Sequence, residues 1–338
     1  MAMTRDDVAK LAGVSSATVS YVINNGPRPV SEGARRKVLW AIEQLNYSPS
    51  TIARSLKTKR THTIGLIISD ILDPFLAFIA KSAEDLLLAQ EYSLTVCNSR
   101  ELPERELGWL RMLRQRRVEG LILLPTGANQ SLLLTMIEAG QHLTLIDRCV
   151  EGVEADCVLI DNEQGAYEAV QHLLALGHRR IGLLNLPSSL APGQGRLEGY
   201  QRALRDAGVP FSGQLVQEGS LTAEESYALA GGLLDLRPPP TALFVASNRL
   251  AEGVLCQAKV RGLRMPDDLA VCVFDDVSYY RFFEPSVTAV SVDGGELAER
   301  AVQFVIERID GAYSGEPRLA RIPCQLQVRE STAGRIQA

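Results

Sequence analysis

Aspartates follow several of the apolar stretches that are typical of buried strands in this chain. Asp73, Asp147 and Asp275 each stand at the end of such a stretch or shortly after it. Carboxylates accept hydrogen bonds from the hydroxyl groups of a ligand. Ligands of parallel sheets bind at the carboxyl ends of the strands. We therefore expect these aspartates to line a ligand site.

The same residues do not make up a recognisable catalytic site. Asp275 and Asp276 form a carboxylate pair suited to acid–base work, but no nucleophile or base partner accompanies them. Gly193-x-Gly195 continues to Gly199, one residue beyond the GxGxxG spacing that cradles a dinucleotide. GxSxG, Walker and HExxH motifs do not occur. The sequence therefore predicts neither catalysis nor a cofactor or metal site.

The cysteines and the N-terminus indicate the cellular compartment. The six cysteines show no CxxC spacing and lie in apolar, strand-like contexts, so we expect buried free thiols in a reducing cytoplasm. No apolar run approaches the roughly 20 residues of a membrane span. The first thirty residues carry charges throughout, unlike a signal peptide. These features predict a cytoplasmic protein that does not bind membranes.

Strand and helix patterns alternate along most of the chain, which is the βαβ rhythm of a parallel sheet. The alternating pattern begins a second time at a similar segment, because His178-Arg179-Arg180-Ile181-Gly182-Leu183 resembles His62-Thr63-Ile64-Gly65-Leu66-Ile67. From this we predict two doubly wound parallel-sheet lobes with a cleft between them. Strands are expected at 64–69, 92–97, 120–124, 143–147, 215–218, 242–246 and 270–275, and helices at 74–90, 103–116, 131–139, 193–207, 223–236, 249–261 and 296–309.

The net charge of −5 hides a division between the two ends of the chain. Residues 1–63 hold ten Lys/Arg and four Asp/Glu, a balance of +6. The remaining 25 cations and 36 acids give −11. A small basic module on a large acidic body indicates that only the module meets a polyanion.

The basic module has the pattern of three short helices. Thr4-Arg5-Asp6-Asp7 matches a capping signature, and Gly13 ends the helix that follows it. A second helix is expected from Ser16 to Asn24, and Ser31 is placed to cap a third. This spacing favours a helix-turn-helix whose second helix enters the major groove of DNA, although any small three-helix bundle could imitate it.

A conditional helix follows the module, between the basic and acidic regions. Ser48 and Pro49 can begin it, and Ile52 and Leu56 share one face beside Arg54 and Lys57. Isolated helices shorter than about 12 residues are marginal in water. The segment therefore needs a partner to become ordered, unless it is a connector packed on its neighbours.

These motifs resemble the LacI/GalR family of bacterial transcription regulators. Asp7-Val8-Ala9-Lys10-Leu11-Ala12-Gly13-Val14-Ser15 and Ala17-Thr18-Val19-Ser20 are similar to that family's head, and Tyr47–Lys57 is similar to its hinge helix. The similarity is greatest to the purine- and ribose-repressor branch. It implies that two hinge helices pair in the minor groove and that Leu56 is wedged between base pairs. The implied DNA-binding residues are Thr4, Ser15, Ser16, Ala17, Thr18, Ser20, Tyr21, Asn24, Ser50, Ala53, Arg54, Leu56 and Lys57.

The resemblance also assigns roles in the body, whose lobes would be those of periplasmic sugar-binding proteins. Ser247 stands where sugar responders often keep Asn, and Leu221 where an aromatic residue is common. Tyr21 likewise departs from the Arg or His that is usual at its position. A simple alternative for Arg196 and Asp275 is a salt-bridged surface pair. The implied effector-binding residues are Asp73, Phe75, Asp147, Arg196, Leu221, Ser247 and Asp275.

The resulting prediction is an α/β protein with a helix-turn-helix head. Residues 1–57 form the head with its hinge helix, 58–63 a linker, and 64–338 the effector-binding and dimerisation domain. Lobe 1 is expected at 64–162 and 293–322, and lobe 2 at 163–292 and 323–338. No leucine heptads follow Arg329-Glu330-Ser331, so a homodimer is expected.

The predicted function is sequence-specific repression of transcription. The partners are double-stranded DNA with a pseudo-palindromic operator, and a small sugar-like effector. Two alternatives on the same α/β fold are a sugar-binding transport protein, which has no use for residues 1–57, and a sugar-processing enzyme, which lacks a catalytic constellation.

Overall fold

The computed structural model describes residues 3–23, 28–47, 60–219 and 222–333. The chain divides into two compact units, Met1–Thr61 and His62–Ala338. Each unit is considered by itself below. The predicted hinge helix and part of the linker lie outside the described residues.

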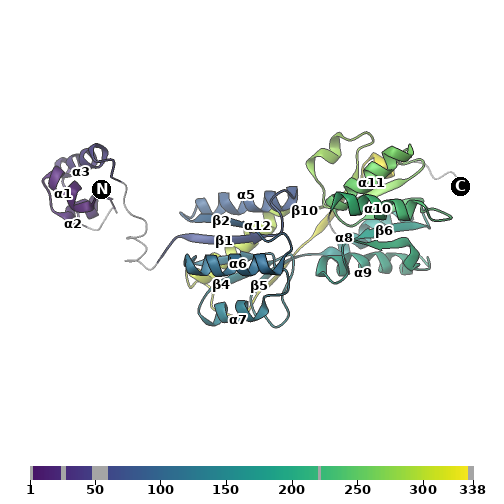
Figure 1. Cartoon of the computed structure of the whole chain (residues 1–338), viewed down its shortest axis with the longest axis horizontal. Helices are drawn as coiled ribbons and strands as arrows, with labels where there is room; N and C mark the ends of the chain where they lie inside the picture. Colours follow the sequence, from purple (N-terminus) through teal and green to yellow (C-terminus); the bar gives the residue numbers. More distant parts are fainter. Residues whose placement is uncertain (1–2, 24–27, 48–59, 220–221, 334–338) are drawn as a thin grey trace. The chain divides into compact units, whose positions relative to one another are not determined.

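The described residues of the first unit form three helices, α1 (Arg5–Ala12), α2 (Ser16–Ile23) and α3 (Glu32–Gln44) (Figure 1). The predicted capping box is present: the Asp7 N–H donates to the Thr4 hydroxyl at 3.3 Å, and the Thr4 N–H donates to the Asp7 carboxylate at 2.9 Å. Gly13 ends α1 with a left-handed φ of 64°. Val8, Val19 and Val38 are fully buried and form the centre of this small core.

The second unit begins with a six-stranded sheet in which all strands are parallel. Its order is β11-β5-β4-β3-β1-β2. Buried residues of α5 (Pro74–Leu88) and α12 (Gly294–Ile309) pack on one face, and those of α6 (Pro103–Gln115) and α7 (Gln130–Glu138) pack on the other. We call this sheet with its helices lobe 1. Its strands are β1 (Thr63–Ile68), β2 (Ser93–Asn98), β3 (Gly120–Leu123), β4 (His142–Ile146), β5 (Asp156–Ile160) and β11 (Leu319–Ile322).

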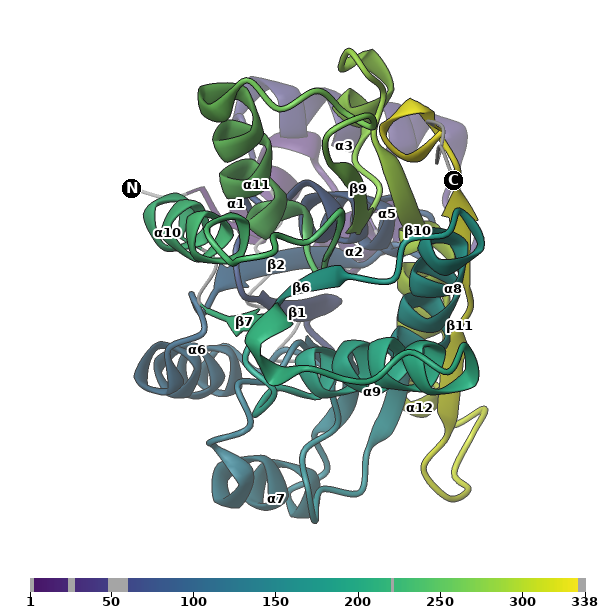
Figure 2. The same ribbon diagram turned by 90° about the vertical axis from the view of Figure 1, so that its right-hand side faces the viewer.

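A second six-stranded sheet, with its helices, forms lobe 2. Its order is β12-β10-β9-β8-β6-β7, and only the β10–β12 pair is antiparallel. Helices α8 (Asn162–Ala175) and α9 (Ala191–Asp206) cover one face, and α10 (Ala223–Leu234) and α11 (Asn248–Arg261) cover the other (Figure 2). Its strands are β6 (Ile181–Asn185), β7 (Val216–Glu218), β8 (Ala242–Val245), β9 (Ala270–Phe274), β10 (Thr288–Val292) and β12 (Cys324–Gln327).

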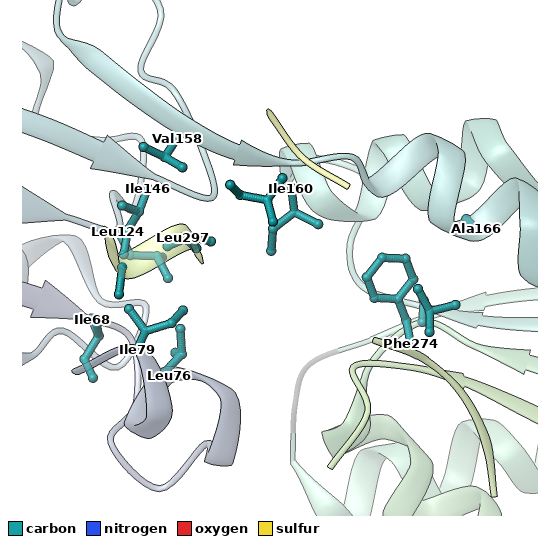
Figure 3. Packing of buried hydrophobic residues seen from close by; sticks show 14 of the residues in the cluster. Ile68, Leu76, Ile79, Leu124, Ile146, Val158, Ile160, Ala166, Phe274 and Leu297 are labelled. Carbon is teal, nitrogen blue, oxygen red and sulfur yellow. The ribbon is translucent and has the colours of Figure 1, made fainter. Parts of the chain in front are cut away.

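The chain passes between the lobes three times, after β5, after β10 and between β11 and β12. One apolar cluster continues through these crossings, so the lobes share a core at their junction. Figure 3 shows Ile160 between residues of lobe 1, such as Ile146 and Leu297, and Ala166 and Phe274 of lobe 2. The predicted fold class is confirmed, and so is the return of the last helix, α12, to lobe 1.

The expectation about the cysteines is wrong for part of the set. Cys97, Cys157 and Cys272 are buried free thiols, but Cys149 and Cys256 are exposed and Cys324 is half-buried. Cys256 lies on a helix, α11, and Cys149 lies in the turn after β4. Apolar neighbours in the sequence therefore did not indicate a buried strand at these two positions.

Candidate functional site

A small cavity lies where the carboxyl ends of the strands of both lobes face each other. It brings together all the described residues that were predicted to bind an effector, which are Asp73, Phe75, Asp147, Arg196, Ser247 and Asp275. Leu221 lies outside the described residues. The cavity encloses about 70 Å³, well below the roughly 300 Å³ at which ligand pockets begin, so a ligand requires the lobes to move apart.

Arg196 lies at the centre of this cavity and is only 4% exposed. Its Nε donates to Asn162 Oδ1 at 2.9 Å, and its Nη1 donates to the carbonyl oxygen of Ala246. Its Nη2 lies 3.6 Å from Asp275 Oδ1, and the guanidinium stacks 3.7 Å from the centroid of the Phe274 ring. Arg196 and Asp275 are therefore paired, but the alternative of a surface pair is wrong because their side chains are only 4% and 12% exposed.

Asp147 and Asp275 occupy equivalent places, because each directly follows a strand, β4 and β9 respectively. Both have left-handed backbones, with φ of 65° and 73°. Non-glycine residues hold this conformation only where the surrounding structure imposes it, and such residues cluster at functional sites. The two aspartates are therefore held in strained positions that bring their carboxylates to the cavity.

Burial and neighbouring carboxylates raise the pKa values of two carboxyl groups at the cavity, Asp147 and Asp275. Burial raises the pKa of Asp275 to about 6; Arg196 opposes this rise, and the negative charges of Asp73 and Asp147 add to it. Burial also raises the pKa of Asp147, against the attraction of Arg148 and Arg196. The cavity therefore holds more negative charge than its guanidinium groups neutralise.

A second ion pair in the cavity was not predicted. Arg148 Nη1 and Nη2 donate to the two carboxylate oxygens of Glu101 at 2.9 and 2.7 Å. Glu101 also has a left-handed φ, of 55°, and it follows β2 at the same edge of the sheet as Asp73 and Asp147. The strand-end rule could have found Glu101, but its pairing with Arg148 joins residues 47 positions apart.

Two contacts cross directly from one lobe to the other. Arg249 Nη1 at the start of α11 donates to Asp70 Oδ2 after β1 at 2.5 Å, and both side chains are about 30% exposed. Asn248 Nδ2 lies 3.5 Å from Asp73 Oδ1. Asp73 also caps α5, because it accepts from the Phe75 N–H at 2.9 Å. These contacts hold the lobes in the conformation that encloses the small cavity.

In the head, the described residues predicted to bind DNA lie at the start of α1 (Thr4), in the turn before α2 (Ser15) and on α2 itself (Ser16, Ala17, Thr18, Ser20 and Tyr21). The Ser16 hydroxyl donates to Asp6 at 2.6 Å and accepts from Arg5 Nε at 2.9 Å, so it ties the two helices together. Ser15 accepts from the Thr18 N–H at 3.1 Å and caps α2. Ala17 is exposed, whereas Thr18, Ser20 and Tyr21 are half-buried. Asn24, Ser50, Ala53, Arg54, Leu56 and Lys57 lie outside the described residues.

In the described part of the chain, His, Cys, Asp and Glu side chains form no group that could hold a metal ion. The helices within 3–23, 28–47, 60–219 and 222–333 include none that is long and apolar enough to cross a membrane.

Comparison with known proteins matches both parts of the chain. Residues 4–50 match the model for bacterial regulatory proteins of the lacI family, and residues 170–332 match the periplasmic binding protein-like domain. The HTH-type transcriptional repressor PurR of Haemophilus influenzae (strain PittEE) is 35% identical over 333 residues, which are 97% of this chain and 98% of the relative.

Solved structures of regulators resemble the whole chain. The lac repressor dimer bound to operator and the anti-inducer ONPF gives a TM-score of 0.86 at 27% identity and covers 99% of this chain and 100% of its own. The transcriptional regulator CelR in its cellobiose complex gives 0.74 at 31% identity, covering 97% of this chain and 99% of its own.

Proposed function

Because the chain belongs to the lacI family of bacterial regulatory proteins, we propose that it is a DNA-binding transcriptional repressor whose operator affinity a small molecule controls. The family consists of regulators, so the chain is not an enzyme. The observation that carries the proposal is the presence, on one chain, of a capped helix-turn-helix head and a two-lobed body with a charged cavity. A transport protein would have no use for the head.

The proposed DNA interface is the outer side of α2 with the segment that follows the head. Ser16, Ala17 and Tyr21, all on α2, are proposed to read base edges in the major groove, where Ala17 could offer only apolar contact, for example with a thymine methyl group. Leu56 is proposed as a wedge in the minor groove, where an apolar side chain unstacks a base step. Leu56→Ala should then weaken specific operator binding and leave non-specific, phosphate-driven binding almost unchanged. Equal losses in both would exclude the wedge.

The proposed effector site is the cavity between the lobes. Arg196 donates to ligand oxygens, and Asp147 and Asp275 accept from hydroxyl groups, which suits a sugar or sugar derivative. Cellobiose in the CelR complex supports this ligand class. Phe75 supplies an apolar wall to the same cavity.

The proposed mechanism is a change in the angle between the lobes. A ligand that bridges them favours one angle over the other, and coupling arises only from its different affinities for the two states, with typical values of about 1–3 kcal/mol. In a dimer, this angle sets the separation of the two linkers at 58–63. It thereby decides whether the segments at 48–57 can pair on the operator.

Assembly and location complete the proposal. We assign residues 1–57 to the head with its hinge, 58–63 to the linker and 64–338 to the effector-binding and dimerisation domain, with the lobe boundaries predicted above. The lac repressor dimer on its operator supports a homodimer on a pseudo-palindromic site. A regulator that binds chromosomal DNA acts in the cytoplasm.

A ligand screen followed by DNA binding tests the proposal. Sugars, sugar acids and purines are screened by thermal shift, in which a true ligand stabilises by about 2.7 kcal/mol at a hundredfold excess over Kd. Each hit is then tested for its effect on binding to genomic operator fragments. A hit that changes operator affinity supports the proposal. A ligand that binds tightly without affecting DNA binding would favour a transport-type protein.

A further inference from the structure

A groove of about 640 Å³ lies beside the effector cavity and shares only Asp147, Arg148 and Ile160 with it. It is lined by the turn after β4, the start of α8, one side of α9 and Arg321 of β11. Cys149 is the thiol in this lining, and its side chain is exposed. The groove thus gives small reagents in solution access to this thiol.

A second thiol lies directly beneath Cys149. The Asp147 N–H donates to the Val158 carbonyl oxygen at 2.8 Å, which folds the turn onto β5 next to Cys157. Val150, the next residue of the turn, packs in the same apolar cluster as Cys157. The side chains of Cys149 and Cys157 lie close enough for each thiol to shift the pKa of the other.

The groove also places a cation near the two thiols. Arg321 pairs with Leu159 in the register of β11 and β5, so it lies on the same sheet face as Leu159 and Cys157. Arg321 is exposed, so its charge is open to the groove that it lines. The other charged groups of the lining are Asp147 and Arg148 from the turn, Asp161 and Glu163 at the start of α8, and Glu198 and Arg202 on α9.

These neighbours lower the pKa of one thiol and raise the pKa of the other. The neighbouring Cys157 thiol lowers the pKa of Cys149 to about 7, burial opposes this, and the positive charge of Arg321 adds to the lowering. Cys149, together with burial, raises the pKa of Cys157. At neutral pH about half of Cys149 is therefore thiolate, while Cys157 stays protonated.

We propose that Cys149 is a redox modification site, at which a hydroperoxide oxidises the thiol and Cys157 then closes an intramolecular disulfide. The Cys149 thiolate attacks one peroxide oxygen, the O–O bond breaks, and the other oxygen leaves as hydroxide or alkoxide. Cys149 becomes a sulfenic acid while the peroxide is reduced. The Cys157 sulfur then displaces the sulfenic hydroxyl, which leaves as water with the Cys157 proton.

Mass spectrometry of the full-length protein tests this chemistry. The reduced protein is treated with hydrogen peroxide, alkylated, and cleaved after Glu151 or Glu154, which separates the two cysteines. The wild type should lose two hydrogen atoms and yield one peptide pair linked through Cys149 and Cys157. Cys256→Ala, which removes the other exposed thiol, should give the same product. Oxidation at Cys256 with Cys149 left reduced would overturn the proposal.

Variants of the pair separate the two steps. Cys149→Ser should form no disulfide, whereas Cys157→Ala should retain a sulfenic acid on Cys149 that a cyclic 1,3-dione traps. The midpoint pH of Cys149 alkylation by iodoacetamide should be near 7 in the wild type and higher in Cys157→Ala and Arg321→Gln. A wild-type product that persists in both cysteine variants, or an unchanged midpoint pH, would contradict the assignment.

The site has one consequence that rests on the proposed function. Asp147 and Arg148, which line the effector cavity, directly precede Cys149, so the disulfide should alter the thermal stabilisation given by effector. The thermal stabilisation by effector is measured independently of the mapping of the disulfide by mass spectrometry. A mapped disulfide without any change in ligand response would therefore argue against the effector site and leave the redox site in place.

Discussion

Replacing Asp275 with asparagine should stabilise the protein at neutral and alkaline pH. The carboxyl group has an ordinary pKa of 3.8 when the chain is unfolded and about 6 in the folded protein, mainly because it is buried. A group whose folded pKa is raised contributes stability below its unfolded pKa and loses that contribution as the pH rises through the folded value. The wild type should therefore lose stability between about pH 4 and pH 6, whereas the asparagine variant should not.

The size of the effect follows from the two pKa values. Their difference is about 2, which at about 1.36 kcal/mol per pKa unit corresponds to about 3 kcal/mol. Above pH 7, Asp275→Asn should thus raise the free energy of unfolding by a few kcal/mol. Below pH 4 the two proteins should be equally stable. The gain comes at the expense of function, because the variant loses an acceptor for ligand hydroxyl groups.

Urea denaturation from pH 4 to pH 8, followed by the fluorescence of Trp109 in the second unit, measures this difference. Asp276→Asn is the matched control, because the neighbouring carboxylate accepts from Arg329 at 2.8 and 2.6 Å. Removing its charge weakens two charge-assisted hydrogen bonds from Arg329, whereas Arg196 lies 3.6 Å from Asp275, so the control should destabilise the protein. An Asp275→Asn variant that is less stable than the wild type at pH 8, or a difference that does not vary with pH, would refute the reasoning.

Three further substitutions test the body. Arg196→Ala should abolish the effect of ligand on operator affinity and leave the affinity of one allosteric state intact; a full response in operator titrations at the same ligand concentrations would exclude Arg196 from the site. Arg249→Ala removes the partly exposed ion pair with Asp70, so calorimetry should show a change in ligand affinity of no more than about fivefold. This change should be smaller at high salt, because salt screens the ion pair in the wild type. A ligand affinity that is unchanged at low salt would contradict the interlobe role of the pair. Gly199→Ala places a Cβ against the α8 backbone and should lower the free energy of unfolding, measured in urea, by at least about 1–3 kcal/mol. Its control is Gly232→Ala, in open space on α10, which should leave that free energy unchanged or raise it. Equal effects of the two substitutions would contradict the close packing of α8 and α9.

Local signals in the sequence predicted local structure well. The cap at Thr4, the left-handed stop at Gly13 and the cap at Ser31 are all present, because each depends on residues within four positions. The strand-end rule brought Asp73, Asp147 and Asp275 to one cavity, since parallel strands align their carboxyl ends.

Long-range pairing could not be predicted in the same way. The pair of Asp70 with Arg249 joins residues 179 positions apart, and nothing near either residue indicates the other. The successive strands β11 and β12 join different sheets because their pairing partners lie far away in the chain. Strand β5 and helix α8 were not predicted, although Asp161 caps the helix by accepting from the Gln164 N–H at 3.4 Å.

The central claim is that this chain binds a symmetric DNA site and that a small-molecule ligand changes its affinity for that site. Selection of duplexes from a random library by the full-length protein, repeated with the effector found by screening, tests both halves at once. The account predicts enrichment of a pseudo-palindromic sequence with two half-sites, and an operator affinity that the effector shifts by about 5- to 150-fold. Binding without sequence enrichment, or enrichment of a sequence whose affinity no cavity ligand alters, would contradict it.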